Sequence, residues 1–152
     1  MGRGIDEIYN DLKSTYDPSR RETVMPNEDK RDFDSKEDVI KQLICIIKDT
    51  NILKQKILYN CMLIGRNFKD LIDKYKVTNT ELDDIIINNV KDCVNPLKGY
   101  SRPMRCKYMQ LHELSLKYNK VMWCCPNSPS EILNNISKLE VKIERDTEFD
   151  WK

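Results

Sequence analysis

The residues of this 152-residue chain that could do chemistry are six cysteines and a single histidine, His112. Zinc in proteins needs four nitrogen or sulfur ligands that converge tetrahedrally on the ion. The candidate zinc set here is Cys93, Cys106, His112 and Cys124. The sequence contains no Cys-x-x-Cys pair of the kind that usually marks such a site, so we interpret these cysteines as free thiols and predict no metal and no cofactor.

Catalysis has few other candidates. His112 beside Cys106 or Cys124 would form a cysteine–histidine nucleophile pair, but no local sequence resembles a cysteine-protease signature. One histidine excludes paired-histidine chemistry, and four glycines exclude most glycine-rich phosphate loops. We therefore expect a protein that is not an enzyme.

A basic and aromatic segment is the most functional-looking part of the chain. Residues 91–122 hold seven basic and two acidic side chains, a net charge of +5 in a chain whose overall net charge is +1. Four aromatic residues interleave with these cations: Tyr100, Tyr108, Tyr118 and Trp123. Cations bind phosphates and aromatic rings stack on bases. Segment 98–123 is thus a candidate nucleic-acid or phosphate contact, made by Lys98, Arg102, Arg105, Lys107, Lys117 and Lys120.

The alternative for this segment is structural. It would be a solvated helix with lysines that extend to water, or a face covered by residues 1–40, whose net charge is −4.

Residues 57–68 carry apolar side chains at helical spacing, at positions Ile57, Cys61, Ile64 and Phe68. The pattern is similar to the death helix of apoptosis regulators. That resemblance implies a helix whose apolar residues insert into the groove of a partner protein. The candidate partner-helix anchors are Ile57, Ile64 and Phe68.

This segment departs from the family at two positions. The family has leucine where Cys61 stands and aspartate where Arg66 stands. Core packing explains the same stripe, and we favour it. Gly65 interrupts the stripe and is less favourable in a helix than alanine by about 1 kcal/mol, so it predicts a close helix crossing or a break.

The elements that position these residues are all predicted to be helices. Apolar periodicity and start signals place them at about residues 4–16, 35–48, 51–75, 80–93, 104–119 and 128–145. Ser35 with Asp38 and Thr80 with Asp83 serve as the start signals of two of them. The run 85–87 is three isoleucines and would also suit a strand, but its polar flanks favour a helix. Residues 121–125 form a short apolar segment that we expect to fill the core.

The fold class is therefore all-α, an irregular bundle of five or six helices. We divide the chain into an N-terminal helical arm with a charged linker (1–34), a helical domain (35–146) and an acidic tail (147–152). The linker holds two prolines and dense charge.

The function expected from these features is that of a non-enzymatic interaction module, a regulator that binds another protein. The alternative is a nucleic-acid-binding or nucleoprotein-associated factor, and a homodimer is a further alternative. The chain lacks alanine and is rich in isoleucine, asparagine and lysine, a bias that suits an A+T-rich genome such as that of a large DNA virus. No secretory or membrane-spanning segment is evident, so we expect an intracellular protein, cytoplasmic or nuclear, without a membrane partner.

Overall fold

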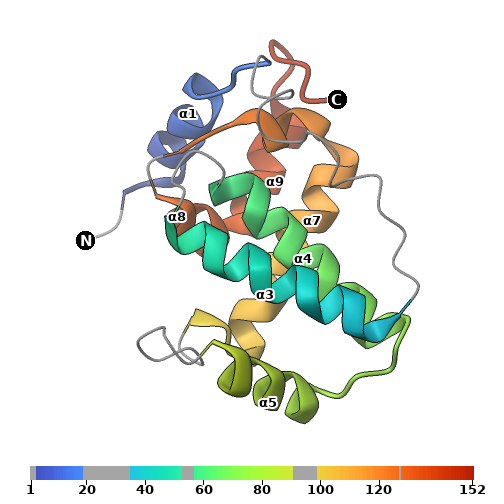
Figure 1. The fold of residues 1–152 in the computed structure, drawn as a ribbon. Helices are drawn as coiled ribbons and strands as arrows, with labels where there is room; N and C mark the ends of the chain where they lie inside the picture. Colours follow the sequence, from blue (N-terminus) through green and yellow to red (C-terminus); the bar gives the residue numbers. More distant parts are fainter. Residues whose placement is uncertain (1–2, 19–34, 53–56, 91–98, 127) are drawn as a thin grey trace.

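The computed structural model describes residues 3–18, 35–52, 57–90, 99–126 and 128–152. Within these ranges it contains seven α-helices, one 3-10 helix and no strand. This confirms the all-α class and corrects the predicted count of five or six helices. In chain order (Figure 1), the elements are α1 (Ile5–Ser14), α3 (Lys36–Ile52), α4 (Ile57–Asp73), α5 (Asn79–Asn89), α7 (Arg102–Lys117), η3 (Asn119–Trp123), α8 (Pro129–Asn134) and α9 (Ile136–Arg145).

The centre of the bundle is the crossing of α4 and α7 at Gly65. A Cβ atom added to Gly65 would lie 2.5 Å from the carbonyl carbon of Tyr108, closer still to its carbonyl oxygen, and 3.0 Å from the amide nitrogen of Met109. Only glycine lets the two backbones approach this closely. The predicted close crossing is confirmed, and α4 continues through Gly65 without a break.

The start of α3 is capped as predicted. The hydroxyl of Ser35 accepts a hydrogen bond of 3.2 Å from the amide of Asp38. The helix then continues past the predicted end near residue 48 to Ile52. The predicted boundary between helices at residues 48–51 is therefore wrong, because no glycine or proline ends α3 there.

The start of α5 differs from the prediction by two residues. The cap is Thr78, whose hydroxyl accepts from the amide of Glu81 at 3.2 Å and lies 3.2 Å from the Glu81 carboxylate. Thr78 is thus the N-cap of α5, and Glu81 stands at the third helical position, as in a capping box, but its carboxylate contacts the Thr78 hydroxyl. The predicted partner Asp83 is instead bound to Arg105. The run 85–87 is helical, as favoured over a strand.

The last predicted helix is divided in two, which raises the helix count. α8 ends at Asn134 and α9 begins at Ile136. Between them, the Asn135 side-chain amide donates 2.8 Å to the carbonyl oxygen of Glu131. Asparagine side chains compete with the backbone for helix hydrogen bonds, and here that competition accompanies the break. Ser128 is the N-cap residue of α8, without a side-chain cap hydrogen bond, and Pro129 is the first helical residue.

The apolar segment after α7 fills the core as predicted. Residues 119–123 form η3, in which Val121 and Trp123 are buried, and Cys124 directly after it is also buried. The amide of Lys120 donates 3.0 Å to the carbonyl oxygen of Trp151. The C-terminal residues are thus held against η3.

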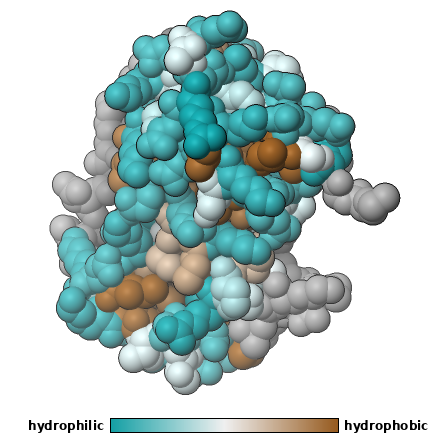
Figure 2. Space-filling view, turned by 180° about the vertical axis from the view of Figure 1, so that it is seen from behind, coloured by the Kyte–Doolittle hydropathy of each residue, from teal (hydrophilic) through white to brown (hydrophobic). Residues whose placement is uncertain are grey.

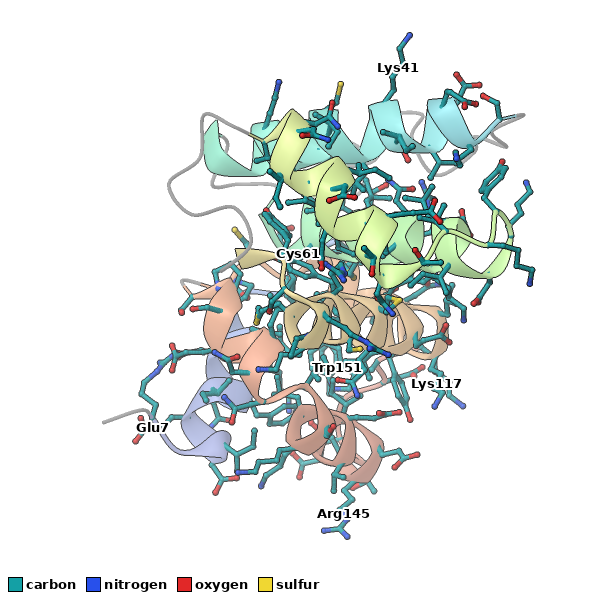
Figure 3. The ribbon with its side chains drawn as sticks, turned by 90° about the horizontal axis from the view of Figure 1, so that it is seen from below. Glu7, Lys41, Cys61, Lys117, Arg145 and Trp151 are labelled. Carbon is teal, nitrogen blue, oxygen red and sulfur yellow. The ribbon has the colours of Figure 1, made fainter. Side chains whose placement is uncertain are left out.

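The N-terminal helix and the C-terminal residues pack against each other. Trp151 is buried and its indole N–H donates 3.0 Å to the Tyr9 hydroxyl. Tyr9 in turn donates a short hydrogen bond to the Asp146 carboxylate, which also binds Lys13 at 2.9 Å. We call the contact of Tyr9, Lys13, Asp146 and Trp151 the α1–tail clasp. Figure 3 shows Trp151 inside the bundle, with Lys117 and Arg145 extending outward.

The clasp shifts the pKa values of its two titrating groups in opposite directions. Burial, followed by the hydrogen bond to Asp146, raises the pKa of Tyr9 to about 12. The hydrogen bonds from Tyr9 and Lys13 lower the pKa of Asp146 below its usual range. The clasp is therefore intact when Tyr9 is protonated and Asp146 is ionised.

Among the described helices, none combines the length and the apolar character needed to cross a membrane.

Replacing Gly65 with alanine tests the crossing. We expect Gly65→Ala to lower the free energy of unfolding by about 1–3 kcal/mol or to prevent folding, because the new methyl group meets rigid backbone. Urea unfolding followed by circular dichroism measures this difference. The matched control is Gly99→Ala, since a Cβ there meets no atom within 4 Å. Equal effects of the two substitutions would contradict the close crossing.

Alkaline titration tests the clasp. Because folding raises the pKa of Tyr9 from its ordinary value of about 10 to about 12, its contribution is fully present below pH 10 and is lost as the pH rises towards 12. Burial also raises the pKa of Tyr108, so the readout must be local to α1. We expect the Trp151 indole N–H resonance to shift over this interval in the wild type. In Tyr9→Phe the shift should vanish, and its persistence there would rule the clasp out as the cause.

Candidate functional site

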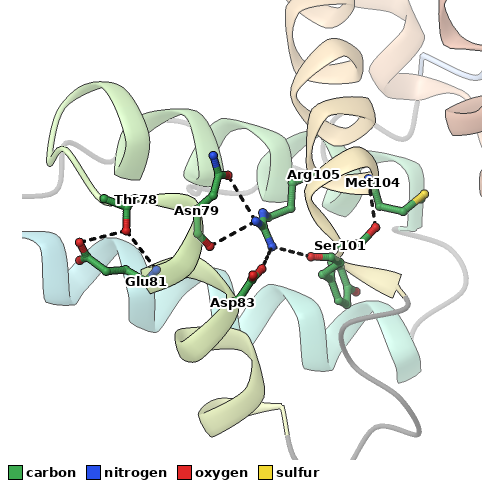
Figure 4. Close-up of polar contacts among 8 residues, drawn as sticks. Thr78, Asn79, Glu81, Asp83, Ser101, Met104 and Arg105 are labelled. Atoms are coloured by element: carbon green, nitrogen blue, oxygen red, sulfur yellow. Dashed lines mark hydrogen bonds and ion pairs between the residues drawn. The ribbon is translucent and has the colours of Figure 1, made fainter.

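Among the described cations, Arg105 on α7 is buried, with 1% of it exposed. Its guanidinium donates to Asp83 at 2.6 Å and to the Tyr100 carbonyl oxygen at 2.9 Å. Longer bonds reach the Asn79 carbonyl oxygen at 3.4 Å and its side-chain oxygen at 3.3 Å. Figure 4 shows how this network ties the start of α5 to the start of α7.

The position of Arg105 does not suit the phosphate contact for which it was a candidate under the nucleic-acid alternative. A phosphate-binding arginine must reach solvent, whereas this guanidinium is enclosed between α5 and α7 and is paired with Asp83. Sequence alone places Arg105 in a cluster of cations, and it cannot show that Asp83, 22 positions earlier, supplies the counter-charge.

The other cations of segment 98–123 are dispersed. Lys107 donates 2.8 Å to Asn134 and Lys117 binds Glu140 at 3.1 Å. Lys120 donates 2.5 Å to the Asp150 carbonyl oxygen, while Arg102 is exposed at the start of α7. Lys98 lies outside the described residues. The structure thus joins three of these lysines to α8, α9 and the tail.

Two of the three candidate partner-helix anchors are core residues. Ile64 and Phe68 are both 0% exposed and belong to the hydrophobic core. Both side chains lie where core packing, the favoured interpretation of this stripe, places them, and neither is exposed to a partner. The side chain of Ile57 is not among those described.

The candidate zinc residues are distributed over different surroundings. Cys106 is exposed, while Cys124 is buried, with its thiol 3.6 Å from the Lys120 carbonyl oxygen. Cys93 lies outside the described residues. Among residues that are described, no group of three or more His, Cys, Asp or Glu side chains is arranged to hold a metal ion.

His112 lines a pocket between α4, α7 and η3. Its volume is about 220 Å³, room for one or two amino-acid side chains. The lining residues are Tyr59, Met62, Leu63, Arg66, His112, Ser115, Leu116, Asn119 and Met122. We call this cavity the α4–α7–η3 pocket. Leu116 on α7 belongs to it and is 65% exposed.

The pocket combines an apolar lining with a few polar groups. Burial, and next the positive charge of Arg66, lower the pKa of His112, so its imidazole is neutral at pH 7. Arg66 donates a long hydrogen bond of 3.5 Å to Gln42 of α3. The Ser115 hydroxyl donates 2.6 Å to the His112 carbonyl oxygen and is turned back onto its own helix. This arrangement suits an apolar group beside a hydrogen-bonding group.

A second cavity lies on the other side of α7, with a volume of about 530 Å³. Its lining includes Cys106, Ile72 and Met109 together with the ion pairs Lys69–Glu113 and Lys117–Glu140. His112 and Cys106 line different cavities, and no cysteine lines the pocket that holds His112. The described part of the chain thus offers no support for a nucleophile pair of these two residues.

Sequence reasoning missed the residues of the pocket. Met62 and Met122 are far apart in the chain and their meeting depends on how η3 folds back on α4. One signal was available, because Arg66 follows directly on an apolar stripe and marks the edge of the buried face of α4. Nothing in the local sequence marks Leu116 as exposed, since the nearby leucines of the same helix, Leu111 and Leu114, are buried.

Removing Asp83 tests the buried arginine network. We expect Asp83→Ala to lower the free energy of unfolding by about 1–3 kcal/mol, because it leaves the Arg105 charge buried without its counter-charge. Glu140→Ala removes the partner of the exposed Lys117 and is the matched control, for which we expect about 0–0.5 kcal/mol. Urea unfolding of both variants gives the comparison. Similar losses of unfolding free energy in the two variants would show that the buried pair of Arg105 and Asp83 stabilises the fold no more than the exposed pair of Lys117 and Glu140.

Comparison of the chain with models of protein families, with curated proteins and with solved structures found no match.

Proposed function

We propose that this chain is a non-enzymatic helical module that binds another protein, and that the α4–α7–η3 pocket receives an apolar side chain of that partner. The observation that carries the proposal is Leu116, a large apolar side chain that is 65% exposed at a preformed cavity. Only Ile87 and Val141 are also large, apolar and exposed among the described residues, and neither lines this pocket.

The lining of the pocket supports a protein partner. Met62, Leu63 and Met122 contribute apolar surface beside Leu116. Methionine side chains are flexible and polarisable, so they adapt to ligands of different shape and are common at protein-binding surfaces. An aliphatic or aromatic anchor in such a pocket is the usual centre of a small interface.

The polar groups at the pocket would fix the orientation of the partner. Asn119 and the neutral His112 line the same cavity as the apolar residues. Each offers hydrogen bonding to the backbone or to a polar side chain of a bound segment. Figure 2 shows, on the face it presents, hydrophobic residues in small separate patches within a hydrophilic surface, which suits a local anchor better than a broad apolar interface.

Nucleic-acid binding through segment 98–123 is the alternative, and its support is weaker. Arg105 is buried, and the described lysines of the segment are engaged with Asn134, Glu140 and the Asp150 backbone. Binding that depends on phosphate contacts also weakens steeply with salt, so salt dependence distinguishes the two.

The experiment uses the full chain as bait in extracts of the cells that express it, with and without nuclease. A partner identified in this way is then purified, and its affinity is measured by calorimetry. We expect Leu116→Glu to weaken binding about tenfold or more, because it places a charge at the apolar anchor site. We also expect affinity to change little between about 0.05 and 0.3 M salt.

The matched control is Ile87→Glu, the same kind of change at an exposed isoleucine of α5. It should leave the affinity within about twofold of the wild type. A partner lost on nuclease treatment, or equal effects of the two substitutions, would contradict the proposal. Circular dichroism confirms that both variants are folded.

A further inference from the structure

The contact between α3 and α4 contains polar side chains that the core does not satisfy. Gln42 of α3 is buried, as are Asn60 and Asn67 of α4. Asn67 is 0% exposed, and neither its amide nitrogen nor its oxygen has a hydrogen-bond partner within the described ranges. The amide nitrogen of Gln42 is in the same situation. Such groups weaken the packed state, because water satisfies them when the contact opens.

Helix geometry places Asn67 on the α3 side of α4. Residues two apart on a helix point about 200° apart, so Asn67 lies nearly opposite Gly65, which faces α7. Apart from α7, α3 is the helix against which α4 packs most extensively. Asn60 precedes Asn67 by two turns and shares its face. The polar groups therefore lie under α3.

No ion pair among the described side chains involves residues 36–48 of α3. The ion pairs that are described join Arg3, α1, α4, α5, α7, α8, α9 and the residue that follows α9. The bond from Arg66 to Gln42 spans α3 and α4, and at 3.5 Å it is at the limit of a hydrogen bond. The described part of α3 packs through its apolar face, chiefly Val39, Leu43 and Ile47.

The position of α3 in the fold lets it move without disturbing the centre. Figures 1 and 3 show α3 on the outside of the bundle, with Lys41 pointing away from it. The crossing of α4 and α7 at Gly65 lies on the opposite side of α4. Loss of α3 packing would therefore leave that crossing in place.

We propose that α3 is a lid that opens as a unit ahead of global unfolding and uncovers an apolar face of α4 with Asn60 and Asn67 at its centre. Opening hydrates the amides that lack partners in the closed state, and this offsets part of the exposure of apolar surface. The proposal is independent of the α4–α7–η3 pocket, because it needs no bound partner.

Native-state hydrogen exchange of the full chain at low urea tests the lid. We expect amides of α3 between Val39 and Lys48 to exchange about tenfold or more faster than those of α7 between Tyr108 and Leu114, with a weaker dependence on urea. The α7 amides should follow global unfolding. If α3 and α7 exchange together at every urea concentration, the lid does not exist.

Substitutions at Asn67 test the cause. Leucine has a branched shape close to that of asparagine and no polar atoms, so Asn67→Leu should slow α3 exchange several-fold relative to α7. Asn67→Asp, with nearly the same shape and a charge, should accelerate it. Asn88→Leu, at an exposed position of α5, is the control and should leave α3 unchanged. Faster α3 exchange in Asn67→Leu would show that the side-chain amide of Asn67 is hydrogen-bonded in the closed state, and this would overturn the proposal. If a variant fails to fold, the comparison of α3 with α7 exchange in the wild type still tests the lid.

Discussion

The structure depends on the absence of one side chain, that of Gly65. At this position the backbone of α7 lies where a Cβ atom would be. The core extends on both sides of the contact between these two helices. The sides of α4 that this crossing leaves free are occupied by α3 and by the pocket that η3 helps to close. A helix with this many neighbours is buried over most of its circumference, which explains why residues 58–65 are all buried.

Charge in this protein is used chiefly to join elements. The basic segment that stands out in the sequence becomes, in three dimensions, a set of connections from α7 and η3 to α5, α8, α9 and the tail. Arg105 shows the principle most clearly, because a fully desolvated guanidinium is tolerated only where carbonyl oxygens and a carboxylate surround it. In a chain with a net charge of +1 and 34% charged residues, these pairs connect helices that lie far apart in the sequence.

The sequence predicted the class and most elements of this fold because apolar periodicity is a local property. The Ser35 cap, the helical run 85–87, the apolar plug after α7 and the close approach at Gly65 all follow from short patterns. The errors also have local causes. The cap of α5 was assigned to Thr80, although the Thr78 hydroxyl accepts from the amide of Glu81, and one side-chain hydrogen bond of Asn135 accompanies the break between α8 and α9.

The candidate site was beyond sequence reasoning for a different reason. The α4–α7–η3 pocket is lined by residues between 59 and 122, which the 3-10 helix η3 brings together. Its exposed residue, Leu116, differs from the buried Leu111 and Leu114 only in the side of α7 on which it lies. The burial of Arg105 likewise depends on the partner Asp83 on another helix. The pocket and the burial of Arg105 each depend on elements that are far apart in the sequence, so neither can be predicted from one segment alone.

The α1–tail clasp has a consequence for how the protein is made. Tyr9 and Trp151 are separated by 142 positions, so α1 leaves the ribosome well before the residues that it packs against. Until then Ile8, Tyr9 and Leu12 form an uncovered apolar stripe on a nascent chain, a surface that invites aggregation or chaperone binding during synthesis.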